Sequence, residues 1–321
     1  MLIETLSTFP HMYDSVMGES MMKRAQEKGI LEFRAHDLRD WTHDRHRTTD
    51  DDPYGGGAGL VMKCEPIFEA VEAILGKEFV EAKLASAMGE SAPGGLASSS
   101  TTVEFGGDVG CPDRASSAAN ETAQWAVSQS EDCLSESGYP AAPPQHRPQI
   151  VFLAPQGRPF DDAYADKLAA ADHLLFICGH YEGIDERVYA LADHVISLGD
   201  YVLTSGELAS MVVIDAAVRK LPGVLGAADG PVDESFTSGL LEYPQYTRPA
   251  DFRGMRVPEV LMSGNHAAIA RWRREQSLAR TAAARPDLIA AAEAADLLTP
   301  ADQKFLKLLE PAPTGAAEGV S

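Results

Sequence analysis

The sequence HLLFICGHYEGIDERV (173–188) begins as an apolar run and becomes a polar loop at Gly179. The same construction occurs on either side of it, in QIVFLAPQGRPF (149–160) and HVISLGDYVLTSGE (194–207). Runs that are apolar at every position are typical of strands buried on both faces, as in a parallel sheet covered by helices. The three stretches therefore predict three neighbouring parallel strands, each followed by a loop that contains glycine.

Helical patterns lie between and after these strands. DDAYADKLAAAD (161–172) has the periodicity of an amphipathic helix, which makes the first two strands part of a βαβ unit. ELASMVVIDAAVRKLPGVLG (207–226) is apolar on nearly every side and predicts a helix buried in a core or, as we prefer, in a subunit interface. We therefore expect an α/β domain.

Loops at the carboxyl ends of parallel strands bind ligands in open α/β sheets. Three such loops are expected together here: PQG (155–157), GHYEG (179–183) and LGDYVLTSG (198–206). The chain has neither a GxGxxG motif between a strand and a helix nor a GxxxxGK[ST] motif. The loops thus favour a ligand that contains adenosine but no phosphates, held by backbone groups and apolar contacts.

Composition indicates a cytoplasmic protein. The chain has 321 residues, of which 45% are hydrophobic, and its four cysteines form no CxxC pair. No apolar run approaches the roughly 20 residues of a membrane-spanning helix, and the N-terminus has the pattern of a first strand and not of a signal peptide. Scattered cysteines are typical of reduced thiols in a cytosol. We expect no membrane partner.

The formal net charge of −21 is unevenly distributed. Eight arginines lie within residues 248–285, and four more lie within residues 34–47. An acidic protein with two clusters of basic residues can attract a polyanion to those clusters and repel it elsewhere. The charge pattern is therefore compatible with a nucleic-acid partner.

Composition also divides the chain into segments. Residues 1–226 form the expected α/β domain, interrupted at 86–147 by a stretch rich in Ser, Ala, Gly and Pro. This stretch lacks hydrophobic periodicity and is interpreted as a disordered insertion without a catalytic role. Residues 227–243 form a polar linker, 244–310 a small all-helical domain with the arginine cluster, and 311–321 a frayed tail.

Capping residues predict two helices in the C-terminal domain. The first is expected to have Ser263 or Asn265 as its N-cap and to end before Pro286. The second is expected to have Thr299 as its N-cap and Pro300 as its first helical residue.

The segment THDRHRTTDDDPYGGGAGL (42–60) places histidine, arginine and acid ahead of a glycine run. A metal site formed by His43, His46 and Asp50–Asp52 is one interpretation. We prefer a flexible loop that closes over a substrate, because the spacing matches no metal-binding motif.

Seven segments in this order resemble a known family: HDRHRTTDDDPYGGGAGLVM, FLAPQGR, CGHYEGIDERV, LGDYVLTSGE, IDAAVRKLPGVLG, LEYPQYTRP and VLMSGNHAAIARWRREQS. They are similar to the bacterial tRNA (guanine-N1)-methyltransferases of the TrmD type, in the SPOUT superfamily. The resemblance covers about residues 1–85 and 148–310, and the 86–147 stretch has no counterpart in it.

The resemblance implies a fold, a reaction and partners. The fold is a SPOUT-type parallel sheet with a deep C-terminal trefoil knot, which composition could not suggest because knots are nearly absent among folds. The reaction is methylation of N1 of the guanosine 3′ to the anticodon (position 37) in tRNA, with S-adenosylmethionine as the methyl donor. The partners are the tRNA anticodon stem-loop and a second copy of the chain, in a homodimer with active sites at the subunit interface.

The resemblance also implies cofactor-binding residues within the three glycine loops. They are Pro155, Gln156, Gly157, Gly179, Tyr181, Glu182, Leu198, Gly199, Asp200, Tyr201, Val202, Leu203 and Gly206. The family's usual glycine pair before the glutamate is Ser205-Gly206 in this chain, a departure that bears on the tightness of that turn.

Guanine N1 is a poor nucleophile while it keeps its proton, so methylation needs a base for that proton and a positive group for charge on O6. The resemblance assigns the positive group to Arg219 and the base to a linker aspartate. This chain reads Asp233-Glu234-Ser235-Phe236 there and has Glu234, one methylene longer, at the aspartate's position. Glu234 is the expected base. Asp233, by a one-residue slip, and a base elsewhere in the chain remain alternatives.

Contacts to tRNA are expected from the linker and the C-terminal domain, where arginines surround Trp272. Phosphate contacts of this kind position a nucleic acid without reading its sequence. The expected substrate-binding residues are Ser235, Tyr246, Arg248, His266, Arg271 and Arg274. No metal ligand is assigned, and magnesium dependence cannot be read from the sequence. A SPOUT ribose 2′-O-methyltransferase and a catalytically inactive RNA-binding module remain alternative functions.

Overall fold

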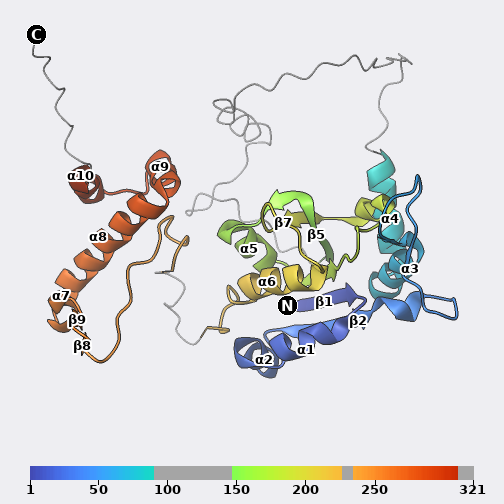
Figure 1. Ribbon diagram of the computed structural model, residues 1–321, viewed down its shortest axis with the longest axis horizontal. Coiled ribbons are helices and arrows are strands. Elements are labelled where there is room, and N and C mark those ends of the chain that lie inside the picture. The colour runs from blue at the N-terminus through green and yellow to red at the C-terminus, as the bar shows by residue number, and fades with distance from the viewer. Residues whose placement is uncertain (90–146, 226–233, 310–321) are drawn as a thin grey trace, which may run out of the picture.

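The computed structural model describes residues 1–89, 147–225 and 234–309 (Figure 1). The interior of the expected insertion, the expected tail and Asp233 lie outside the described residues. None of the helices in the described ranges is long and apolar enough to cross a membrane.

The core of the α/β domain is a five-stranded parallel sheet with the strand order β2-β1-β6-β5-β7. The three apolar runs form three neighbouring strands of this sheet, as the sequence predicts, and the N-terminal residues form another. The strands are β1 (Leu2–Ser7), β2 (Glu32–Asp37), β5 (Gln149–Pro159), β6 (His173–Ile177) and β7 (His194–Ser197).

Helices cover both faces of the sheet and give three layers (Figure 1). One face is covered by α1 (Asp14–Met17), α2 (Ser20–Glu27), α5 (Asp162–Ala169) and α6 (Gly206–Val218). The other is covered by α3 (Cys64–Leu75), α4 (Lys77–Gly89) and the 3-10 helix η3 (Glu186–Leu191). Shorter connecting elements are η1 (Pro10–Tyr13), η2 (Leu38–Trp41), β3 (Asp50–Asp51) and β4 (Val61–Met62).

Burial on both faces explains the unbroken apolar run of β6. Leu174 and Phe176 lie in the core beneath α5 and α6, whereas Leu175 and Ile177 lie in the core beneath α3. All four side chains are buried. Because successive side chains of a strand point to opposite faces, a sheet with two covered faces needs apolar residues at every position.

β5 pairs with β7 at two places along its length. Leu153 and Arg158 are both register partners of Ile196, with a register shift between them. A strand residue has two hydrogen-bonding edges, so these two partners lie on either side of Ile196. A Cβ on Gly157 would lie 2.5 Å from the backbone nitrogen of Ile196. The β5 chain therefore crosses closely against β7, and only a glycine fits at the crossing point.

Helix α6 is shorter than its apolar sequence suggests. The expectation of a helix over 207–226 is wrong at its C-terminal end, because α6 ends at Val218. Pro222 lacks a backbone N–H, and Gly223 has a φ of +85°, so the residues after the helix form turns.

A partly buried carboxylate ties together the described residues on both sides of the 90–146 segment. Asp193 accepts hydrogen bonds from Lys83 Nζ (2.5 Å), Arg147 (2.7 Å) and the Ile150 backbone N–H (2.9 Å). Burial alone would raise the pKa of Asp193, but these donors lower it below its usual value. Helix α4 continues to Gly89, so residues 86–89, which composition grouped with the insertion, are helical.

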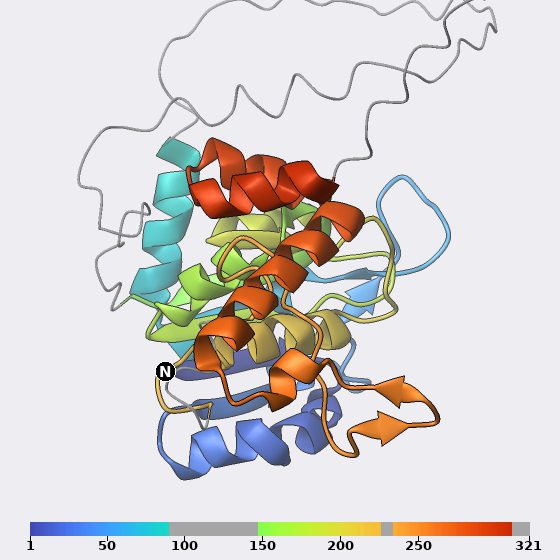
Figure 2. The same cartoon turned by 90° about the vertical axis from the view of Figure 1, so that its left-hand side faces the viewer.

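The helices of the C-terminal residues lie together as a separate group (Figure 2). They enclose a smaller core of their own, formed by Leu240, Leu278, Ala292 and Leu298. Asn265 and Thr299 are N-caps as expected: their side chains accept hydrogen bonds from the N–H groups of Ala268 and Asp302, each 3.2 Å long. The helix α9 was not anticipated. The elements are β8 (Asp251–Phe252), β9 (Met255–Arg256), α7 (Glu259–Met262), α8 (His266–Ala284), α9 (Pro286–Ala294) and α10 (Pro300–Leu309).

Candidate functional site

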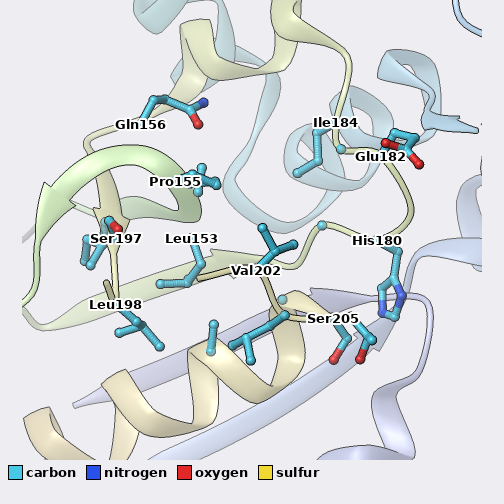
Figure 3. Close-up of a pocket in the computed structure, with 18 of the residues that line it drawn as sticks. Leu153, Pro155, Gln156, His180, Glu182, Ile184, Ser197, Leu198, Val202 and Ser205 are labelled. Carbon is cyan, nitrogen blue, oxygen red and sulfur yellow. The ribbon is translucent and has the colours of Figure 1, made fainter. Parts of the chain in front are cut away.

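A cavity of about 310 Å³ lies where the three glycine loops meet at the carboxyl edge of the sheet (Figure 3). Eleven of the expected cofactor-binding residues line this pocket: Pro155, Gln156, Gly179, Tyr181, Glu182, Leu198, Gly199, Tyr201, Val202, Leu203 and Gly206. The remaining two, Gly157 and Asp200, are not among its lining residues. The structure thus brings together segments that are about 50 residues apart in the chain.

Gly206 holds two of these loops in contact. Its N–H donates a hydrogen bond of 2.8 Å to the carbonyl of Gly179. A Cβ on Gly206 would lie 2.7 Å from the backbone nitrogen of Gly179 and 3.0 Å from Cys178 Cα. No side chain fits between these backbones, which explains the glycine on physical grounds.

A fully buried carboxylate beneath the pocket was not anticipated from the sequence. Glu207, in the first turn of α6, accepts a hydrogen bond from Ser7 Oγ through one oxygen and from His180 Nε2, at 2.6 Å, through the other. The ring of His180, which lines the pocket, also packs against Phe9 with ring centroids 4.9 Å apart. Glu207 therefore fixes the end of β1 and the loop after β6 to the start of α6.

The other lining residues were not assigned one by one from the sequence. Gly183, Thr204 and Ser205 lie within the expected glycine loops. The rest, most of them apolar or small, carry no signal of their own: Leu153, Ala154, Ile184, Glu186, Tyr189, Ile196, Ser197 and Ala209. Burial raises the pKa of Tyr189, so its hydroxyl stays protonated near neutral pH. None of the lining residues is a lysine or an arginine, whereas Glu182 and Glu186 are acids.

The 42–60 segment leads to one wall of the pocket. The Leu60 carbonyl accepts a hydrogen bond from the Glu182 N–H (3.1 Å), and the Met62 N–H donates to the Gly183 carbonyl (2.9 Å). His43 contacts Glu69 at 2.7 Å. In the part of the chain that the structure describes, no group of three His, Cys, Asp or Glu residues could hold a metal ion.

Arg219 and Glu234, the expected catalytic pair, form an ion pair of 2.7 Å. Arg219 is the C-cap of α6, and Glu234 is the first described residue after the 226–233 gap. The neighbouring Ser235 uses its hydroxyl to accept a hydrogen bond from the Glu242 N–H (2.9 Å), which shapes the linker. Asp233 lies outside the described residues.

Two of the three arginines expected to bind tRNA, Arg271 and Arg274, have different surroundings. Arg274 forms a bidentate contact with the buried carboxylate of Asp302, at 2.9 and 3.1 Å, and so joins α8 to α10. Burial alone would raise the pKa of Asp302, but Arg274 and the Thr299 N–H lower it. Arg271 is exposed, one turn earlier on α8. The guanidinium of Arg274 is therefore occupied by a contact that stabilises the fold, whereas Arg271 faces solvent.

The other expected substrate contacts lie on the same C-terminal unit. Tyr246 and Arg248 line a second cavity of about 270 Å³, and the ring of Tyr246 lies 6.3 Å from that of Trp272. His266 is exposed at the first turn of α8. Tyr246 and Arg248 thus share one cavity, and Tyr246 lies beside Trp272.

Fold and pocket together define an α/β protein with a ligand pocket at the carboxyl edge of a parallel sheet. Sequence comparison gives the family. The family described as tRNA (Guanine-1)-methyltransferase TrmD matches residues 1–101 and 134–291. This chain belongs to that family, and it is a methyltransferase.

Curated relatives agree over nearly the whole length. A tRNA (guanine-N(1)-)-methyltransferase of Symbiobacterium thermophilum is 44% identical over 307 residues, which cover 96% of this chain and 97% of that protein. Proteins of the same name from Limosilactobacillus reuteri and Geotalea uraniireducens are 43% and 42% identical, over 91% and 97% of both chains. The internal stretch without a match to the family is 102–133, shorter than the 86–147 stretch that composition set apart.

Proposed function

We propose that this protein transfers a methyl group from S-adenosylmethionine to N1 of the guanosine at position 37 of tRNA, 3′ to the anticodon. Family membership and the name shared by the relatives support the reaction. The observation that carries the chemistry is the 2.7 Å pair of Arg219 and Glu234. It presents a cation and a carboxylate side by side, as N1–H and O6 stand side by side on guanine.

The pocket supports binding of the methyl donor. Its volume of about 310 Å³ is at the lower end for small-molecule sites, and its lining combines glycine turns with apolar and uncharged polar side chains. Lining by Glu182 and Glu186 without any lysine or arginine disfavours phosphates and favours a cationic ligand. When bound, the donor supplies a methyl group on a positively charged sulfur. We assign its binding to the eleven lining residues given above.

Glu234 and Arg219 have complementary tasks in this proposal. The Glu234 carboxylate accepts the N1 proton, which makes the nitrogen lone pair available for attack on the methyl carbon. The Arg219 guanidinium stabilises the negative charge that grows on O6 as the proton leaves. Both side chains are partly exposed and can exchange their mutual contact for contacts with a guanine. Asp233 remains the alternative base.

The length of α6 supports a homodimer with shared active sites. Gly206 lines the pocket at one end of this 13-residue helix, and Arg219 caps the other end. At 1.5 Å per residue these ends lie about 20 Å apart, too far for one chain's acid–arginine pair to serve its own pocket. Leu208 and Val212 leave an exposed apolar stripe on α6. Two copies related by a two-fold axis across this stripe bring each pocket to the partner's pair.

The C-terminal unit is proposed to bind the anticodon stem-loop. Arg248, Arg271 and His266 are available to contact phosphates, and Tyr246 lies beside Trp272 as a surface on which an unstacked base can pack. A target guanosine must leave the loop's stack to reach the pocket. A tRNA substrate supports a cytoplasmic location for the reaction.

The crossing of β5 over β7 supports the trefoil knot implied by the resemblance. Residues 154–157 pass against Ile196 between two pairings on opposite edges of β7. The chain that follows β7 then returns to Gly179 through Gly206. A chain that encircles a later strand in this way is the arrangement that a knot requires.

A methyl-transfer assay tests the proposal. Labelled S-adenosylmethionine is incubated with the full-length protein and two tRNA transcripts that differ only in carrying guanosine or adenosine at position 37. We expect transfer to the guanosine transcript alone, with mass mapping that finds the methyl group on the base. A methyl group on ribose would identify the alternative 2′-O-methyltransferase, and binding of both ligands without turnover would identify an inactive RNA-binding module.

Two linker variants then test the base. Glu234→Gln should lower the rate of transfer on the order of 100-fold while donor affinity stays unchanged, because the amide cannot take the proton. Asp233→Asn is the matched control and should remain close to the parent. The reverse pattern would move the base to Asp233, and two active variants would place it elsewhere in the chain.

A further inference from the structure

Ser205 occupies the N-cap position of α6 without capping the helix. Its backbone has the extended conformation usual for an N-cap, with φ −153° and ψ 142°, yet its side chain makes no cap hydrogen bond. The residue is 6% exposed, and its hydroxyl has no hydrogen-bond partner among the residues that the structure describes. A good capping group is thus left unused in a buried position.

An unpartnered buried hydroxyl lowers stability, because it has lost its bonds to water and gained none. Four polar side-chain atoms in the described residues are buried without a partner: the hydroxyl oxygens Thr5 Oγ1, Thr8 Oγ1 and Ser205 Oγ, and the nitrogen Arg273 Nε. Ser205 alone among these four residues lines the glycine-loop pocket. The pocket therefore contains a hydrogen-bonding group that the described residues leave unsatisfied.

The backbone around Ser205 is fixed on both sides. Ser205 forms an antiparallel bridge with His180, and the next residue donates its N–H to the Gly179 carbonyl at 2.8 Å. Figure 3 shows Ser205 beside His180 at one end of the lining side chains. With its backbone held, Ser205 keeps one internal freedom, the choice among three staggered positions of its hydroxyl about the Cα–Cβ bond.

We propose that Ser205 is a ligand-binding residue whose hydroxyl turns from its dry position to hydrogen-bond the adenosine-containing ligand of the pocket. The inference rests on the proposed function, because that function identifies the ligand as S-adenosylmethionine. The hydroxyl both donates and accepts, so it can serve a ribose hydroxyl, a carboxylate or an ammonium group. The unpartnered hydroxyl destabilises the free protein, and this destabilisation is removed when the ligand supplies the missing hydrogen-bond partner.

The test compares the parent with Ser205→Ala, which keeps the backbone and Cβ and removes only the oxygen. Calorimetric titration with S-adenosylmethionine and with S-adenosylhomocysteine gives affinities without any turnover. Loss of the hydrogen bond should weaken both by about 2-fold to 12-fold where the partner is a ribose hydroxyl, and by more than about 12-fold where it is a charged group. Ser205→Gly should weaken them similarly. Titration with adenosine locates the contact: a weakened affinity assigns it to the nucleoside half, and an unchanged one to the amino-acid half.

Thr5→Val is the matched control, because it removes another unpartnered buried hydroxyl, on β1, outside the lining of the pocket. It should leave both affinities unchanged. A second readout is the unfolding temperature of the ligand-free protein, which should not fall in Ser205→Ala because no bond is lost there. A purely structural cap predicts the opposite, a less stable free protein.

Three outcomes would overturn the assignment. Equal affinities in the parent and Ser205→Ala would mean that the hydroxyl serves no ligand, as when a buried water satisfies it. A lower unfolding temperature with unchanged affinity would make Ser205 a helix cap. Absence of binding in the parent itself would remove the proposed function together with this inference, and is thereby distinguished from the other two.

Discussion

His180 and the fully buried Glu207 form a hydrogen bond of 2.6 Å that joins two walls of the pocket. His180 belongs to the loop after β6, and Glu207 belongs to the first turn of α6. The second oxygen of the carboxylate accepts a bond from Ser7 at the end of β1. A charged acceptor with no exposed surface is stable only with such donors, so the three elements depend on one another.

Glu207→Gln should lower the free energy of unfolding by about 1–3 kcal/mol. The amide replaces one acceptor oxygen with a donor, so a buried bond to Ser7 or His180 is lost or reversed. Urea unfolding followed by circular dichroism measures the change. Glu81→Gln, on the exposed side of α4, is the control and should stay within about 0.5 kcal/mol of the parent. A Glu207 variant that matches this control would show that the buried acceptor contributes nothing.

Gly206→Ala should lower donor affinity by more than about tenfold. The added Cβ would lie 2.7 Å from the Gly179 backbone nitrogen, and backbone atoms on both sides cannot yield without moving a pocket loop. Calorimetric titration with S-adenosylmethionine measures the loss. Gly89→Ala is the control, since a Cβ there meets nothing within 4 Å. Parent-like affinity in Gly206→Ala would mean that the two loops tolerate separation.

Local patterns predicted the sheet, because a strand that is buried on both faces has apolar residues at consecutive positions. The run 173–177 is apolar at each position after its histidine, and the structure buries these side chains in two separate cores. The three glycine loops followed from the same pattern, and the structure brings them to one pocket. Chain direction and strand ends are local properties, so sequence spacing was sufficient for them.

Contacts between distant segments could not be predicted in this way. Ser7 and Glu207 are 200 residues apart, and nothing in either neighbourhood indicates the other. Arg274 looked like its neighbour Arg271 in the sequence, yet a carboxylate 28 residues away commits it to the fold. The C-terminal end of α6 was missed because apolar residues continue past Val218, while Pro222 and Gly223 turn the chain.

Arg271→Ala and Arg274→Ala should separate tRNA binding from stability. Arg271 is exposed, so its loss should weaken tRNA binding and reduce the salt dependence of the affinity by about one phosphate contact, with stability almost unchanged. Arg274→Ala leaves the buried Asp302 carboxylate without its partner. Because Arg274 is partly exposed, we expect a loss of about 1–3 kcal/mol in unfolding free energy.

Filter binding at several salt concentrations and urea unfolding measure the two effects. Arg274→Lys is a useful second variant, because an ammonium cannot reproduce the bidentate contact and should restore stability only in part. Equal effects of the two alanine variants on both readouts would contradict the distinction between a tRNA contact and a helix clamp.

His194 should make the protein less stable in mild acid. Its ring is buried between Tyr164, whose hydroxyl donates to Nδ1 at 2.9 Å, and Gln149, whose carbonyl accepts from Nε2 at 2.7 Å. Burial lowers the pKa of His194 to about 4. Between pH 6.5 and 4 the unfolded chain therefore binds a proton that the folded protein does not, and stability falls with pH by up to roughly 3 kcal/mol.

His194→Gln can keep both hydrogen bonds but does not titrate. The contributions of all other titrating groups cancel in the difference in unfolding free energy between parent and variant. This difference should be constant above pH 7. On acidification the parent should lose more stability than the variant. A difference that stays flat down to pH 4.5 would show that the folded protein admits the proton, and hence that the ring is not held neutral by its surroundings.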